Sequence, residues 1–390
     1  MTATRSPRRP RILAVLALAG LAFGASVAPA HAAPEPYQGV ALTISGRYHP
    51  DKTVFDDAGN AYILAVVQHE TRGESAVVLR RSKSGTLTRV AGDATRQGIT
   101  KPDKAINAKF RGIDDIALDS RGNLYIADCV SRVVTKVSPK GRLTIVAGQV
   151  GKSGKPKPGK ATSTRLKCPT ILAVDAERNV FIGDWALSAV MKVTPSGTLS
   201  IVTGQPGKPG FPTAGPARQS RLGNPAGLAV DTKGNLYIAD AAPYCLIEKV
   251  TPEGELSIVA GRGGYGVPKP GRLATKTFLG IPSSVAVDKD GNLFVGMSNS
   301  LYAKRQLAVV GKIGGDGVLR VVAGRIGKRG KPTPGPATKS KLDFGPTVSV
   351  DRSGKVYAAL SVAFGSKGSY VVRITKKGRL SIVERMFTLR

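Results

Sequence analysis

The sequence predicts an all-β protein, a six-bladed β-propeller built from four-stranded antiparallel blades. One phrase recurs six times along the 390 residues, and its clearest copies read LDSRGNLYIAD (118–128) and VDTKGNLYIAD (230–240). An aspartate anchors each copy, with spacings of 63, 56, 56, 57 and 63 residues. These aspartates are Asp56, Asp119, Asp175, Asp231, Asp288 and Asp351. Because such a unit is too short to fold alone, each repeat must bury its apolar surface against its neighbours.

Each repeat contains four short strand signals. In the second repeat, apolar and β-branched runs cover residues 116–118, 124–127, 133–137 and 143–146, with turn residues between them. No long helical period follows the first 32 residues, so four-stranded sheets must stack either linearly or radially. Four strands per repeat favour the radial arrangement.

The turns between these strands have their own repeated chemistry. The first turn reads Asp-x-x-Gly-Asn, in which the Asp can accept N–H groups of the turn and Gly supplies the left-handed conformation. We interpret the six repeated aspartates as turn formers rather than catalytic groups. Asp128, Asp184 and Asp240, at the ends of second strands, are expected to brace loops in the same way.

These motifs resemble the bacterial NHL-repeat family. The fourth repeat carries the P-x-G-L-A-V-D-x-x-G-N-L-Y-I-A-D phrase and the following K-V-T-P-x-G-x-L-S-I-V-A-G phrase over residues 225–261, and residues 335–342 match the G-P-A-T-x-S-x-L linker. The resemblance covers about residues 50–385 and implies a six-bladed propeller. Since NHL propellers include binding platforms, sensor domains and a few enzymes, it does not settle function. Residues 380–383 and 40–44 both resemble the outer strand that would close the ring.

The N-terminus is predicted to be a secretory signal peptide, residues 1–32, followed by one propeller domain, residues 33–390. Arg5, Arg8, Arg9 and Arg11 precede an apolar run, and residues 30–32 read Ala-His-Ala, a small-residue cleavage site. No later apolar segment is long enough to span a bilayer, so no transmembrane segment is predicted. We expect a secreted protein, extracellular or associated with the cell surface.

Three cysteines are an odd number for an exported chain. Cys129 begins the loop after a second strand, and Cys168 ends the linker that enters the third repeat. A propeller places both on one face between adjacent blades, so we predict a Cys129–Cys168 disulfide. Cys245 is expected to be a small buried hydrophobe.

The linkers between repeats hold most of the excess positive charge. The chain has 58 Lys and Arg against 26 Asp and Glu, and the linkers 92–111, 148–168, 204–224, 261–280 and 324–345 contain 24 of the basic residues but only 3 Asp. The predicted polyanion-binding residues, which we call the linker cations, lie in four of these linkers. They are Lys152, Lys155, Lys157, Lys160, Lys208, Arg262, Lys269, Lys328, Arg329 and Lys331.

A ring of cationic linkers on one propeller face would attract polyanions by counterion release and long-range steering. We expect an anionic polymer as partner, such as a wall phosphate polymer or an acidic polysaccharide. A protein partner is an alternative, and the oligomeric state is open. Because aromatic residues are sparse in the linkers, sequence-specific binding of nucleic acid is not expected. The competing interpretation is that the charge serves only solubility.

An enzyme is the alternative from another class: a metal-dependent hydrolase, lactonase or lyase at an acidic channel mouth. The starts of the inner strands offer Asp51, Asp114, Asp115, Thr170, Ser283, Ser284 and Thr347. Asp51, Asp114 and Asp115 could bind calcium through oxygen ligands, although such a cluster could equally neutralise basic residues. Only His49 and His69 follow the signal segment, so a multi-histidine metal site cannot form. No nucleophile motif or phosphate loop is present, and no other cofactor is predicted.

Two aromatic residues mark where the otherwise similar repeats differ. Trp185, the single tryptophan, and Tyr244 follow second strands on the face that carries the linkers. They are candidate ligand contacts, suited to a sugar ring, and the alternative is packing between blades. The function we favour is a non-enzymatic binding module with a basic propeller face. A protein-interaction scaffold and the enzyme described above remain the alternatives.

Overall fold

The structure is a computed structural model. It describes residues 40–41, 46–69, 73–93, 98, 100–110, 112–299, 306–343, 345–360, 369–385 and 387–389, all within one compact unit, Pro34–Arg390. The predicted signal segment 1–32 lies outside the described residues. Within the described part, no helix is long and apolar enough to cross a membrane.

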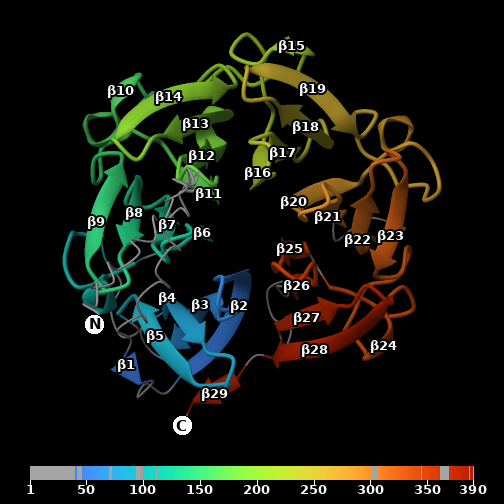
Figure 1. The fold of residues 1–390 in the computed structure, drawn as a ribbon, viewed down its shortest axis with the longest axis horizontal. Coiled ribbons are helices and arrows are strands. Elements are labelled where there is room, and N and C mark those ends of the chain that lie inside the picture. Colours follow the sequence, from blue (N-terminus) through green and yellow to red (C-terminus); the bar gives the residue numbers. More distant parts are fainter. Residues whose placement is uncertain are drawn as a thin grey trace, which may run out of the picture. The chain divides into compact units, whose positions relative to one another are not determined.

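Six antiparallel sheets surround a common centre (Figure 1). Each sheet is one blade, and its four main strands follow one another in chain order from the centre to the rim. The all-β, six-bladed β-propeller predicted from the repeats is therefore confirmed. The described helices are four short 3₁₀ turns: η1 (Ala105–Asn107), η2 (Ala161–Ser163), η3 (Trp185–Leu187) and η4 (Ala274–Lys276).

The first three blades contain the strands of the first three repeats, with added edge strands. Blade 1 consists of β1 (Val40–Ala41), β2 (Gly46–Phe55), β3 (Ala61–His69), β4 (Gly73–Arg81) and β5 (Leu87–Ala91), with β29 (Phe387–Leu389) beside β2. Blade 2 consists of β6 (Asp115–Leu118), β7 (Leu124–Asp128), β8 (Val133–Val137) and β9 (Leu143–Ala147). Blade 3 consists of β10 (Gly159–Lys160), β11 (Pro169–Val174), β12 (Val180–Asp184), β13 (Ala189–Val193) and β14 (Thr198–Thr203).

The remaining blades repeat this order. Blade 4 consists of β15 (Gly215–Pro216), β16 (Pro225–Val230), β17 (Leu236–Asp240), β18 (Leu246–Val250) and β19 (Glu255–Ala260). Blade 5 consists of β20 (Ile281–Val287), β21 (Leu293–Ser298), β22 (Ala308–Ile313) and β23 (Leu319–Ala323). Blade 6 consists of β24 (Gly335–Pro336), β25 (Thr347–Val350), β26 (Val356–Leu360), β27 (Tyr370–Ile374) and β28 (Arg379–Arg385).

The repeated aspartate closes the turn between the first two strands of every blade. In all six blades, one of its carboxylate oxygens accepts a hydrogen bond from the backbone N–H four residues later, at 2.7–2.9 Å. In blade 2, Asp119 also accepts bonds from the Asn123 amide at 2.8 Å and the Tyr125 hydroxyl at 3.2 Å. Gly122 there has φ 75°, and Arg178 takes the corresponding left-handed position in blade 3 at φ 66°. The aspartates are turn formers, as predicted.

The hydrophobic core lies between blades rather than within them. One cluster joins Leu64 of blade 1 to Ile116 of blade 2 through Phe110 of the linker, and a second joins blades 2 and 3 through Leu166. Leu222 has the same place between blades 3 and 4. Each linker therefore inserts apolar side chains between two blades while its polar residues stay near water.

The ring closes where blade 6 meets blade 1. Of the two candidate closing segments, 380–383 lies in β28, the outer strand of blade 6, whereas Val40 and Ala41 pair outside blade 1 along β5. β29 then pairs with the inner strand β2. Across the same junction, the rings of Phe55 and Tyr357 lie 4.3 Å apart. The two ends of the chain thus complete the ring by edge pairing and apolar contact.

Glu248 is an exception to the apolar core. It lies on β18, it is 0 % exposed, and neither carboxyl oxygen has a hydrogen-bond partner in the described structure. Burial, and then the nearby charge of Asp240, raises the pKa of Glu248 well above its usual value. The same site in the preceding blade holds the buried apolar Met191. Glu248 is therefore held neutral in a place that a hydrophobic side chain fills elsewhere.

We predict that Glu248→Met stabilises the protein by about 1–3 kcal/mol at neutral pH, because it removes an unsatisfied buried carboxyl group. The folded state holds this proton more tightly than the unfolded state. Its contribution to stability is therefore complete below the unfolded pKa near 4.5 and is lost as pH rises toward the raised folded pKa. Thermal unfolding at pH 5, 6.5 and 8 should show an advantage of the variant that grows with pH. Glu255→Met, at an exposed site on β19, is the matched control, and a pH-independent advantage of Glu248→Met would contradict the assignment.

Candidate functional site

The five linkers end on one face of the ring. Each inner strand begins beside the end of the second strand of its own blade: Pro169 pairs with Asp184, and Pro225 pairs with Asp240. Both the linker ends and the loops after the second strands therefore meet there. We call this side, where inner strands begin and second strands end, the linker face.

Three buried aspartates fasten the loops of the linker face. Asp184 accepts bonds from the backbone N–H groups of Lys167 at 2.7 Å and Cys168 at 3.0 Å. Asp240 accepts bonds from Gly223 and Asn224, each at 2.6 Å. Asp128 does the same for its own loop, accepting the Ser131 N–H at 2.7 Å and the Thr100 hydroxyl at 2.6 Å. Their predicted role as loop braces is confirmed.

Burial raises the pKa of all three bracing carboxyl groups, and that of Asp240 reaches about 6. Hydrogen bonds from the loops oppose this rise, since they favour the ionised form. The braces and the linkers thus stabilise one another, because each loop N–H finds a charged acceptor that solvent does not screen.

A disulfide joins Cys129, after β7, to Cys168, at the end of the linker that enters blade 3. Their Cα atoms are 4.2 Å apart. The bond therefore connects blades 2 and 3 on the linker face, at the place that the sequence suggested. Cys245 is unpaired and buried, and burial raises the pKa of its thiol to about 12, so it is not a reactive thiolate at neutral pH.

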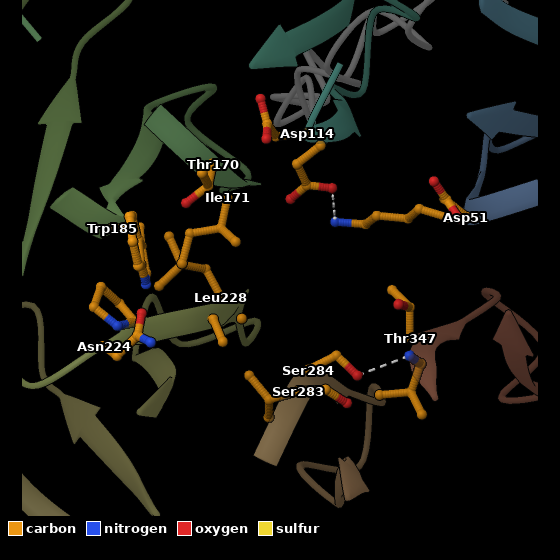
Figure 2. A pocket seen from close by; sticks show the side chains of 17 residues that line it. Asp51, Asp114, Thr170, Ile171, Trp185, Asn224, Leu228, Ser283, Ser284 and Thr347 are labelled. Atoms are coloured by element: carbon orange, nitrogen blue, oxygen red, sulfur yellow. Dashed lines mark hydrogen bonds and ion pairs between the residues drawn. The ribbon is translucent and has the colours of Figure 1, made fainter. Parts of the chain in front are cut away.

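A pocket of about 470 Å³ opens at the centre of the linker face (Figure 2). Residues at or near the starts of the inner strands supply most of its wall, and Trp185 of η3 is added from a loop. Figure 2 shows Trp185, Thr170 and Asn224 on one side, Asp51 opposite, and Ser283 and Thr347 below. The strand starts named from the sequence all line this pocket, which we call the channel-mouth pocket: Asp51, Asp114, Asp115, Thr170, Ser283, Ser284 and Thr347.

Asp115 is bound to three blades. Its carboxylate forms an ion pair with Lys52 of β2 and accepts a hydrogen bond from the backbone N–H of Leu172 in β11 at 2.8 Å. It also accepts the Ile116 N–H at 2.7 Å. Burial raises the pKa of Asp115, while Lys52 and these N–H groups oppose the rise. Asp115 therefore has a structural role, and both of its carboxylate oxygens already have partners within the protein.

The described structure does not gather Asp51, Asp114 and Asp115 into a calcium-binding cluster, so this site stays a prediction of the sequence. Within the described residues, no three His, Cys, Asp or Glu side chains come together in a way that could hold a metal ion. The physical reason is that Lys52 already neutralises Asp115, while Asp114 is directed to the loop, where it accepts the Cys129 N–H at 2.9 Å. The fold places these acidic residues around one pocket, but their carboxyl groups do not come together at one position.

Among the acidic residues of this pocket, Asp114 has a pKa close to neutral pH. Partial burial is the main cause that raises the pKa of Asp114 to about 6, and the neighbouring carboxyl groups of Asp128 and Asp115 add to it. The hydrogen bond from Cys129 opposes the rise. Part of Asp114 still reaches solvent, and at neutral pH, above this pKa, its carboxylate can accept a hydrogen bond from a ligand.

The two candidate aromatic contacts have different surroundings. Trp185 is 53 % exposed and lines the channel-mouth pocket. Tyr244 does not line it; its ring packs edge-on against Phe211 at 5.3 Å between centroids. The indole is therefore available to a ligand, and the phenol is mainly part of the packing between the loop after β17 and the linker 204–224.

The linker cations lie in or near water. Nine of the ten are exposed and Arg329 is partly buried. None of the nine exposed cations forms an ion pair with a carboxylate in the described structure, and Arg262 lies over the ring of Phe278 at 4.8 Å from its centroid. Lys160 belongs to β10, which pairs with the first residues of β14 at the rim (Figure 1), so it lies beside the turn between β13 and β14 and not on the linker face.

Two polar residues that line the pocket, Lys52 and Asn224, were not predicted from the sequence. Lys52 follows Asp51 directly in the sequence. A lysine beside the predicted cluster of Asp51, Asp114 and Asp115 indicates that it could form an ion pair with one of them. Asn224 precedes the inner strand β16, where the equivalent place before β11 holds Cys168. Aligning the residues that precede the inner strands would have identified Asn224 as a residue that lines the channel-mouth pocket.

Comparison with known proteins supports the fold. Residues 212–386 match the family described as Teneurin NHL domain. Teneurin-3 of Mus musculus is 27% identical over 221 residues, covering 49% of this chain and 8% of that protein, and Teneurin-1 of Gallus gallus is 28% identical over 224 residues with the same coverage. This chain therefore spans only a small part of the length of these relatives.

Two solved structures are similar to this chain over most of its length. A virginiamycin B lyase from Staphylococcus aureus has a TM-score of 0.46 and 12% identity, covering 88% of this chain and 86% of that one. A putative gluconolactonase has a TM-score of 0.46 and 14% identity, with coverages of 91% and 95%. With TM-scores below 0.5, neither structure informs the activity of this chain.

We predict that removing the disulfide by the double change Cys129→Ala and Cys168→Ala lowers the free energy of unfolding by about 2–4 kcal/mol, because the unfolded chain gains freedom. Denaturant unfolding with and without reductant measures this. Reductant should destabilise the unaltered protein to the same degree and leave the double variant unchanged. Equal stability of the unaltered protein in both conditions would mean that the bond does not constrain the fold; Cys245→Ala, which keeps the bond, is the control.

Proposed function

We propose that this protein, a six-bladed β-propeller of NHL type, is a non-enzymatic binding module that holds an anionic polymer outside the cell or at its surface. The observation that carries the proposal is the exposure of nine linker cations, all except Arg329, without carboxylate partners in the described structure. Lys152, Lys155 and Lys157 are exposed within one linker, and Lys328 and Lys331 are exposed within another. These ammonium groups remain available for a ligand.

The linker architecture supports this role. Apolar residues such as Ala161 and Leu166 are buried between blades, while the cations of the same linker stay in solvent. Anchoring fixes the backbone of a cationic segment at one end without neutralising it. A chain of phosphates or carboxylates can then contact several linkers at once, and release of its counterions drives association.

Solubility alone is a weaker explanation for this charge. A solubilising charge can lie on any surface, whereas here 24 of the 58 basic residues lie in the five linkers beside only 3 Asp. Surface charges also need no anchoring by buried neighbours. The uneven distribution and the repeated anchoring both favour a binding surface.

An acid–base enzyme is the second candidate, and Asp114 is the observation that favours it. A carboxyl group with a pKa of about 6 lies in the range for general acid–base catalysis. The metal-dependent form of this candidate has no support among the described side chains, where no three-ligand cluster occurs. The Ser283 and Ser284 hydroxyls in the channel-mouth pocket donate hydrogen bonds to the Pro346 carbonyl rather than to a general base, so binding is the better proposal.

We predict that the purified protein binds wall phosphate polymer or heparin-like polysaccharide with an affinity that falls steeply with salt. If 6–10 anionic groups are contacted, affinity should fall by about 10³–10⁵ between 50 and 200 mM salt. Changing Lys152, Lys155 and Lys157 to Gln should reduce the slope of log affinity against log salt by about 2–3. Retention on immobilised polymer at increasing salt measures both effects.

The matched control changes the same number of exposed charges, with Lys233, Lys376 and Lys377 replaced by Gln. These lysines lie on turns within blades 4 and 6, away from the linker that holds Lys152, Lys155 and Lys157. This control should bind like the unaltered protein. If both triple variants lose affinity equally, the interaction depends on net charge alone and the linker surface has no special role. Binding that persists unchanged at high salt would instead favour the protein-interaction scaffold.

A further inference from the structure

Two strongly exposed aromatic side chains lie in consecutive linkers. Phe211, in linker 204–224, is 49 % exposed, and Tyr265, in linker 261–280, is 62 % exposed. Large apolar side chains are usually buried, and a group of exposed ones marks a surface that contacts another molecule. Neither ring belongs to the clusters that join blades 3, 4 and 5. Packing of the blades therefore does not explain these two side chains.

The fold brings the two linkers together at one place on the linker face. The Phe211 ring packs edge-on against that of Tyr244, which lies in the loop after β17. The Gly264 N–H donates a hydrogen bond to the Tyr244 carbonyl oxygen at 2.8 Å. Gly263 lies so close to the Phe211 ring that a Cβ atom there would be 3.3 Å from it. Tyr265 follows directly, and we call Phe211, Tyr244 and Tyr265 the aromatic patch.

Buried contacts hold the backbone beneath the aromatic patch. Asp240, at the end of β17, accepts the N–H groups of Gly223 and Asn224, each at 2.6 Å. The Gly210 N–H, just before the exposed phenylalanine, donates to the carbonyl oxygen of the buried Leu222 at 3.0 Å. A surface that is already fixed in this way loses little conformational entropy when a ligand binds to it.

Positive charge accompanies the aromatic patch. Lys208 precedes Phe211 by three residues, and it is exposed. Arg262 has the same spacing from Tyr265, and its guanidinium lies over the Phe278 ring at 4.8 Å from the centroid. Neither cation forms an ion pair with a carboxylate in the described structure, and the two linkers contain no Asp or Glu. An anionic ligand therefore meets cations and apolar rings at the same place.

The combination of rings and cations discriminates between anionic polymers. A chain of phosphates has no flat apolar surface, so it would contact the cations but not the rings. A pyranose ring presents C–H groups that pack on aromatic side chains, and an acidic sugar carries its charge beside that face. Single-stranded nucleic acid stacks successive bases on a series of rings. Here the rings of Phe211 and Tyr244 lie at 78° to each other, so they form a corner rather than a series of platforms.

We propose that the aromatic patch selects an acidic polysaccharide, a chain of pyranose rings with carboxylate or sulfate groups, as the polymer that the linker face binds. This inference rests on the proposed function. Sugar rings pack their C–H faces on Phe211 and Tyr265, and the acidic groups pair with Lys208 and Arg262. The other linker cations contribute to affinity for any polyanion, whereas the aromatic patch contributes only for a polymer that contains rings.

The test compares a polyanion that contains sugar rings with one that has none. Polygalacturonate and inorganic polyphosphate are titrated into the full chain at 50 and 200 mM salt, and calorimetry gives the affinities. Tyr265→Ala and Phe211→Ala should each weaken polygalacturonate binding about five- to tenfold and leave polyphosphate binding unchanged. Because neither change removes a charge, the slope of log affinity against log salt should stay the same.

Two controls separate ligand contact from folding. Leu273→Ala removes a side chain that is 51 % exposed in the same linker as Tyr265, but beside Val318 at the turn between β22 and β23, away from the linker face. This variant should bind both polymers normally. Tyr265→Phe keeps the ring and should also bind normally. Thermal unfolding of Phe211→Ala is measured as well, because that ring contacts Tyr244; Tyr265→Ala provides the same test without such a contact.

Several outcomes would overturn the proposal. Both alanine variants could bind polygalacturonate as well as the unaltered protein does, or lose polyphosphate binding to the same degree. Alternatively, the dependence on the two rings could appear with oligodeoxythymidylate or phosphatidylglycerol vesicles instead of polygalacturonate, which would make the patch a site for bases or for a bilayer. In each of these cases binding of polyanions by the linker cations would stand. If the unaltered protein binds neither polygalacturonate nor polyphosphate, the proposed function fails together with this inference.

Discussion

Burial of each blade against the next is the constraint on which the rest of this structure depends. A blade of four short strands has apolar residues on both faces, and none of the clusters that join neighbouring blades could form from one repeat. The linkers contribute Phe110, Leu166 and Leu222 to these clusters. Because their anchors are buried, the linkers can carry many like charges in water without detaching from the ring.

Electrostatics divide the linker face into two zones. The outer zone consists of exposed lysines and arginines, whose mutual repulsion is screened by solvent and salt. At the centre, Asp115 with Lys52 and Leu172 ties blades 1, 2 and 3 together, and Asp51 and Asp114 lie beside it. The two zones are formed by different residues, so the charge of the linkers and the centre of the face could be altered independently.

Buried acids recur across the fold, and they have different consequences. Asp128, Asp184 and Asp240 are buried but saturated with hydrogen bonds from loops, so they fix the face on which ligands would bind. Glu248 is buried without a partner, and it is kept neutral by a raised pKa. These four acids differ in their hydrogen-bond partners rather than in how deeply they are buried, since burial raises the pKa of each of them.

The sequence by itself determined the repeats, the strands and the turns, because this information is local. An aspartate that bonds to an N–H four residues later, as Asp119 does with Asn123, requires no distant partner. It also determined which residues begin the inner strands and so line the pocket. Only the tertiary structure decided that Lys52 pairs with Asp115, 63 residues away, that Trp185 is exposed while Tyr244 packs against Phe211, and that the oxygens of Thr170 and Asn224 lack partners. These outcomes depend on how neighbouring blades pack. The sequence of one repeat does not specify which side chains of the next repeat it will contact.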